Sequence, residues 1–109
     1  MKGLGSIKFG EVIIKILSDS PAMTVAELHF PSGVSADVHH HINEEANYVV
    51  KGVFETPLNN ELTSFSPGDL LHIESNKNHS LKCISEENGV ILTVWTPSRK
   101  DLISKLKEA

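Results

Sequence analysis

Residues 33–52 read GVSADVHHHINEEANYVVKG and concentrate histidine and glutamate in a short, strand-like segment. Side chains two residues apart on a β-strand share a face, so His39 and His41 project to one side while His40 points to the other. Glu45 lies four residues beyond His41, an even step that can return its carboxylate to the same side. The segment therefore predicts two imidazoles and one carboxylate on a common face.

His79 is expected to supply a third imidazole from a separate strand. Three imidazoles and one carboxylate suit one divalent transition metal ion, such as Zn, Mn, Fe, Ni or Cu, and leave coordination positions for water or substrate. An isolated His-x-His pair is also typical of a solvated strand face. The pattern alone leaves both interpretations open.

The rest of the chain has the organisation of an all-β protein. Short β-rich runs recur at regular intervals and end in turn residues, which is typical of a sandwich or barrel. The expected strands are Glu11–Leu17, Met23–Phe30, Val38–His41, Ala46–Glu55, Leu62–Phe65, Leu70–Ile73, Ser80–Ile84 and Val90–Thr96. Closure into a barrel would leave no exposed edges. One short helix is expected at about residues 98–108, where Leu102, Ile103 and Leu106 form an apolar stripe.

The composition is that of an ordinary globular protein. With 109 residues, 39% hydrophobic and 22% charged, we expect one domain spanning residues 1–109. A net charge of -4 gives no basic surface for phosphate contacts, so neither nucleic acid nor a membrane is an expected partner. The single cysteine, Cys83, cannot form an intramolecular disulfide, and no signal peptide is evident, which favours a cytoplasmic location.

The sequence resembles the cupin family. The complete first motif of that family is matched by Gly33, His39, His41, Glu45 and Gly52. Gly68 and His79 stand at the spacing of the second motif. The usual Pro, Gly and Asn of that motif are replaced by Glu74, Asn76 and Cys83. The resemblance implies an antiparallel, jelly-roll-like β-barrel that holds one metal ion through His39, His41, Glu45 and His79. A homodimer is a further expectation from the family.

A narrower resemblance is to the small cupins of pectin and alginate breakdown that open the ring of 4,5-unsaturated monouronates. It is carried by the runs 15–17, 47–52 and 93–101. The last run is similar to that group's Asp-x-Phe-x-Pro-x-Arg segment, with Arg99 and Trp95 in the positions that line the site. Thr93 replaces the catalytic acid, and Glu45 stands where the group often has Gln. Arg99 is therefore expected to bind and orient a substrate carboxylate.

Other residues have candidate roles in the same pocket. With Thr93 in the acid's position, the proton acceptor would be Glu44, His29 or a metal-bound hydroxide. Trp95 and His29 are candidate substrate contacts, and Cys83 shares the parity of His79 along its strand. Cys83 is also typical of a small core residue, Trp95 of a core aromatic, and Arg99 of a plain surface charge.

Three functions are compatible with these features. The first is metal-assisted chemistry on a small oxygenated metabolite such as a sugar acid, with uronate ring opening as the leading reaction. The second is an iron-dependent dioxygenase, because three-His-one-Glu cupins include such enzymes. The third is a non-catalytic module that binds a metal or a small ligand.

Overall fold

The structure, a computed structural model, describes residues 3–39 and 41–108. The elements in these residues are β1 (Gly5–Phe9), β2 (Val12–Ser20), β3 (Met23–Phe30), β4 (Ser35–His39), β5 (Glu44–Lys51), β6 (Phe54–Leu58), β7 (Glu61–Phe65), β8 (Leu70–Ile73), β9 (His79–Cys83), β10 (Gly89–Thr96) and α1 (Lys100–Glu108). His40 lies outside the described residues, and so does the side chain of His39.

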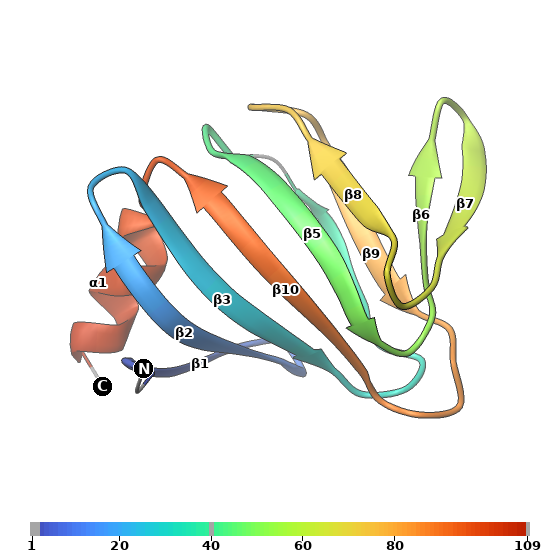
Figure 1. Cartoon of the computed structure of the whole chain (residues 1–109), viewed down its shortest axis with the longest axis horizontal. Helices are drawn as coiled ribbons and strands as arrows, with labels where there is room; N and C mark the ends of the chain where they lie inside the picture. Colours follow the sequence, from blue (N-terminus) through green and yellow to red (C-terminus); the bar gives the residue numbers. More distant parts are fainter. Residues whose placement is uncertain (1–2, 40, 109) are drawn as a thin grey trace.

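The strands form two antiparallel sheets, which confirms the all-β, jelly-roll prediction. The larger sheet has the order β1-β2-β3-β10-β5-β8, and the smaller has the order β4-β9-β6-β7. Figure 1 shows β10 in the middle of the larger sheet, although it is the last strand of the chain. Among the described residues, no strand pairing joins the two sheets, so they form a two-sheet jelly roll rather than a continuously bonded barrel.

Alternating side chains build the core between the sheets. Val12, Ile14 and Ile16 of β2 are buried, and the residues between them on the strand are exposed. Phe30 of the larger sheet and Phe54 of the smaller sheet meet edge to face, with ring centroids 5.1 Å apart. The apolar contact of these two rings therefore holds the sheets together at the end where β3 and β6 meet.

The structure divides the expected strand Ala46–Glu55 into β5 and β6. The break is at Gly52, whose φ of 82° is a conformation that glycine adopts without a steric penalty. A Cβ atom there would also lie 2.8 Å from the Cα atom of Gly89. The chain therefore turns at Gly52 and crosses from the larger sheet to the smaller one.

The two ends of the chain also differ from expectation. β1 was not predicted; it pairs with β2 as a hairpin through Gly10, and only Ile7 of its residues is partly buried. The C-terminal helix is confirmed, but it begins at Lys100 rather than at residue 98. The Ser98 hydroxyl, two residues before the helix, donates to Asp19 at 2.7 Å.

Candidate metal centre

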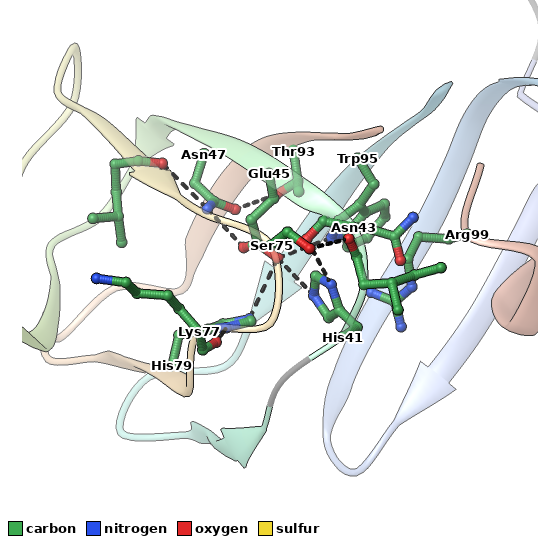
Figure 2. A network of polar contacts seen from close by, with 12 residues as sticks. His41, Asn43, Glu45, Asn47, Ser75, Lys77, His79, Thr93, Trp95 and Arg99 are labelled. Atoms are coloured by element: carbon green, nitrogen blue, oxygen red, sulfur yellow. Dashed lines mark hydrogen bonds and ion pairs between the residues drawn. The ribbon is translucent and has the colours of Figure 1, made fainter. Parts of the chain in front are cut away.

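Three side chains of the predicted ligand set meet between the sheets. His41 lies in the loop after β4, Glu45 is in β5, and His79 begins β9. One ligand atom from each lies within 4.8 Å of the others, and Figure 2 shows the three side chains pointing toward one another. Glu45 is 5% exposed and His79 is 9% exposed. A buried cluster of two imidazoles and a carboxylate is therefore present.

Backbone carbonyls fix the orientation of both imidazoles. Nδ1 of His41 donates to the Asn43 carbonyl at 3.1 Å, and Nδ1 of His79 donates to the Lys77 carbonyl at 2.9 Å. Nε2 of the two rings then lies 2.9 Å and 3.3 Å, respectively, from Oε1 of Glu45. When Nδ1 carries the hydrogen of a neutral imidazole, Nε2 has the lone pair that binds a metal. The rings are therefore set to present Nε2 to one point.

The cluster has a strong electrostatic bias. Burial alone raises the pKa of Glu45, but hydrogen bonds with His41 and His79, the charge of His79 and the amide of Asn47 lower it well below its usual range. Burial lowers the pKa of His79, while the hydrogen bond to Glu45 and its charge outweigh that effect and raise it. The carboxylate is ionised, so a cation has to accompany it, either a proton on an imidazole or a metal ion.

Two loops are fastened around His41. The Asn43 side chain donates to the carbonyls of Pro97 and Ser98 at 2.5 Å and 3.3 Å. The backbone N–H of Asn76 donates to the His41 carbonyl at 2.8 Å. Asn76 has a φ of 59°, a left-handed conformation that asparagine tolerates. Asn76 thus adopts a positive φ at the position where the cupin motif usually has glycine.

A chain of buried hydrogen bonds holds the Glu45 carboxylate. Nε1 of Trp95 donates to Oε1 at 3.0 Å, and Nδ2 of Asn47 donates to Oε2 at 2.8 Å. Thr93 donates to Oδ1 of Asn47 at 2.8 Å and is fully buried. Asn47 was not among the predicted site residues, although its place two residues after Glu45 puts it on the same face of the strand.

A cavity of about 200 Å³ lies beside the cluster. Its polar lining consists of His41, Arg99 and Asp101, with Trp95 next to them. Its apolar lining consists of Phe9, Val12, Ile14, Leu28, Phe30, Ala36 and Leu102. The Arg99 guanidinium lies 4.8 Å from the Trp95 ring centroid, and its Nε and Nη2 donate to the Asp101 carboxylate at 3.0 Å and 2.9 Å. The predicted contacts Arg99 and Trp95 therefore share a cavity with His41.

Three other candidate residues lie elsewhere, which corrects the sequence interpretation. Glu44 neighbours Glu45 on the strand and so faces outward, where its carboxylate lies 2.8 Å from Nε2 of exposed His72. His29 also faces outward, 3.2 Å from Glu27. Cys83 is fully buried, with Sγ 3.4 Å from the Ser85 hydroxyl, and does not line the cavity beside the cluster. Strand parity gave Cys83 the right face but not its distance from His79.

The donor set fits a transition metal. Two imidazoles with Nδ1 bonded to carbonyls and one ionised carboxylate are ligands that Zn, Fe, Mn, Ni and Cu accept. The register of β4 and β9 brings the backbone of His39 opposite that of His79.

Comparison with known proteins gives the family. Residues 26–95 match the profile of the cupin domain. The chain belongs to the cupin family. No curated protein sequence shows a significant match to this cupin.

Solved structures similar to this cupin share its fold over most of their length. One is KdgF from Halomonas sp., with a TM-score of 0.81 and 24% identity over 89% of each chain. Another is an RmlC-like cupin from Shewanella frigidimarina, with a TM-score of 0.76 and 20% identity over 94% of this chain and 99% of that chain. A predicted oxalate decarboxylase from Thermotoga maritima has a TM-score of 0.76 and 21% identity, with 85% and 92% covered.

In residues 3–39 and 41–108, no helix has both the length and the apolar character needed to cross a bilayer.

Proposed function

We propose that this cupin binds one divalent transition metal ion through His39, His41, Glu45 and His79 and acts on a small anionic metabolite. The observation that carries the proposal is the convergence of Nε2 of His41 and Nε2 of His79 on one oxygen of Glu45. His39 completes the set because the β4–β9 register brings its backbone beside His79. When bound, the metal supplies a Lewis acid that polarises a ligand oxygen.

Arg99 is the proposed binding group for the ligand's negative charge. Its guanidinium lines the cavity that His41 also lines, and the Trp95 ring supports it from one side. Two parallel N–H groups can donate to a carboxylate in bidentate fashion. The Asp101 carboxylate now holds that position, so a ligand carboxylate would replace it or bind beside it.

Asp101 is also the proposed proton acceptor. Hydrogen bonds from Arg99 hold the pKa of its carboxyl below the usual range, so it is ionised near neutral pH. It lines the cavity beside His41, whereas Glu44 and His29 face outward from the larger sheet. Displacement from Arg99 by a ligand would free the Asp101 carboxylate to accept a proton from a ligand hydroxyl.

The leading reaction is opening of the ring of a 4,5-unsaturated monouronate to its open-chain keto form. It is supported by the resemblance of the 93–101 segment to the small cupins of pectin and alginate breakdown, and by the shared cavity of Trp95 and Arg99. The test is to supply metal-loaded protein with unsaturated galacturonate and mannuronate products and to follow loss of the ring alkene absorbance. No loss with either product would exclude this reaction.

The apolar lining of the cavity favours a second candidate. Most of the lining residues are hydrocarbon side chains, among them Val12, Ile14, Leu28 and Phe30, which suit a ligand with an apolar body. An iron-dependent dioxygenase acting on such a ligand is compatible with the proposed three-histidine, one-glutamate set. Consumption of dioxygen by the Fe(II)-loaded protein would favour this candidate, whereas ligand-induced stabilisation without turnover would favour a binding module.

A further inference from the structure

Two buried polar residues lie opposite each other next to Glu45. Thr93 of β10 pairs in register with Asn47 of β5, and their exposed fractions are 0% and 1%. Burying polar groups this deeply is unfavourable unless each is hydrogen-bonded. Oγ1 of Thr93 donates to Oδ1 of Asn47 at 2.8 Å, which satisfies both side chains at once.

The Asn47 amide has one orientation that satisfies its surroundings. Nδ2 donates to Oε2 of Glu45 at 2.8 Å and to the Leu71 carbonyl at 3.3 Å. Both partners accept hydrogen bonds, so a reversed amide would place oxygen against oxygen. The Thr93 hydroxyl supplies the donor that Oδ1 needs in the observed orientation. The hydroxyl and the two acceptors therefore select the same amide orientation.

We propose that Thr93 and Asn47 are positioning residues for Glu45 as a metal ligand, an inference that rests on the proposed metal binding. The amide of Asn47 holds Oε2, which keeps Oε1 turned toward the imidazoles of His41 and His79. Threonine has a specific use at position 93, because an ionised acid there would have no proton to donate to Oδ1. The hydroxyl thus takes part in metal binding without contacting the metal.

The experiment compares Thr93→Val with Thr93→Ser. Valine keeps the shape but removes the donor, while serine keeps the donor. We expect the Zn(II) affinity of Thr93→Val, measured by chelator competition, to fall by about 10- to 100-fold. Losses of this size are typical when a residue hydrogen-bonded to a metal ligand is replaced. Thr93→Ser should bind with nearly wild-type affinity. The visible spectrum of the Co(II) form should change in Thr93→Val and be retained in Thr93→Ser, because it reports the geometry around the metal.

Ile91→Val is the matched control for lost stability. Ile91 is buried two residues earlier on β10 and has no polar contact with the cluster, so this variant should lose thermal stability and keep metal affinity. Thr93→Ala replaces Thr93→Val should the latter fail to fold. Wild-type affinity and spectrum in the variant without a hydroxyl would overturn the positioning role alone. Absence of metal binding by wild-type protein would overturn the proposed function and this inference with it.

Discussion

Nε2 of His41 lies 2.9 Å from Oε1 of Glu45, although β4 and β5, the strands on either side of this short segment, belong to different sheets. His41 lies two residues beyond His39, where β4 ends, and Glu45 is the second residue of β5. The loop between them is held by one of its own residues, Asn43, whose side chain donates to the carbonyl of Pro97. The four-residue step from His41 to Glu45 thus spans the connection from the smaller sheet to the larger one, and the cluster lies at this connection.

The thermal stability of the metal-free protein and the affinity for metal should change in opposite directions with pH. His79 has a pKa raised above its ordinary value of 6.5 because it is bonded to the Glu45 carboxylate. A raised folded-state pKa gives stability that is present at low pH and lost as pH rises through that pKa. The metal-free protein should therefore melt at a lower temperature as the pH rises above 6.5 and through the raised pKa of His79.

Metal binding needs His79 neutral, so affinity should rise over the same pH interval. Chelator competition and thermal melting at matched pH values measure the two trends. If the melting temperature of the metal-free protein and the metal affinity changed in the same direction with pH, the assignment of His79 as a ligand would be contradicted.

Removal of the guanidinium should weaken binding of an anionic ligand. Arg99→Ala is expected to raise KM or Kd for a carboxylate ligand by about 10- to 100-fold, since a hydrogen bond to a charged group contributes about 1.5–3 kcal/mol. The KM or Kd of Arg99→Lys should lie between those of wild type and Arg99→Ala, because lysine keeps the charge but lacks the planar guanidinium. Equal ligand affinity in all three proteins would place the anion site elsewhere.

Asp101→Asn should separate the two roles proposed for Asp101. The substitution removes the negative charge that now accepts hydrogen bonds from the Arg99 guanidinium. An anionic substrate then has no competing carboxylate, so its KM should fall. It also removes the proposed proton acceptor, so kcat should fall as well. Steady-state kinetics reports both values. A lower KM with unchanged kcat would leave Asp101 as a competitor for Arg99 and exclude it as the base.

Gly89 should be intolerant of any side chain because two parts of the core approach it. A Cβ atom there would meet the ring of Phe54 and lie 3.1 Å from Sγ of Cys83. We expect Gly89→Ala to lower the free energy of unfolding by about 1–3 kcal/mol, measured by urea denaturation. Gly10→Ala meets no atom within 4 Å, so its loss should come only from its φ of 59°, about 1 kcal/mol. Wild-type stability in Gly89→Ala would contradict the packing explanation.

Local patterns predicted most of the strands, although not β1, and most of the cluster, because strand parity depends only on neighbouring residues. Parity placed Glu45 inward, as observed. It could not give the register between β10 and β5, which sets Thr93 opposite Asn47. Register depends on the whole sheet, so the hydroxyl was interpreted as a missing acid rather than as a hydrogen-bond donor.

Local patterns also could not predict how far along a strand a residue lies from the cluster. Cys83 has the inward parity of His79, yet it packs against Gly89, at the end of β9 away from the cluster. The break at Gly52 was missed for a similar reason, since the runs on either side of it are both β-rich. A turn inside a strand-like run is apparent only when the glycine's φ is known.

The metal content of purified protein tests the central claim most directly. Wild-type protein should hold about one transition metal ion per chain, and His41→Ala and His79→Ala should hold far less, because each removes a buried imidazole from the cluster. His72→Ala is the matched control, since His72 lies exposed on the outer face of the larger sheet. Elemental analysis of the four proteins should find about one ion per chain in wild type and His72→Ala, and far less in the other two variants. Equal metal content in all four proteins would contradict the assignment of the cluster as a metal centre.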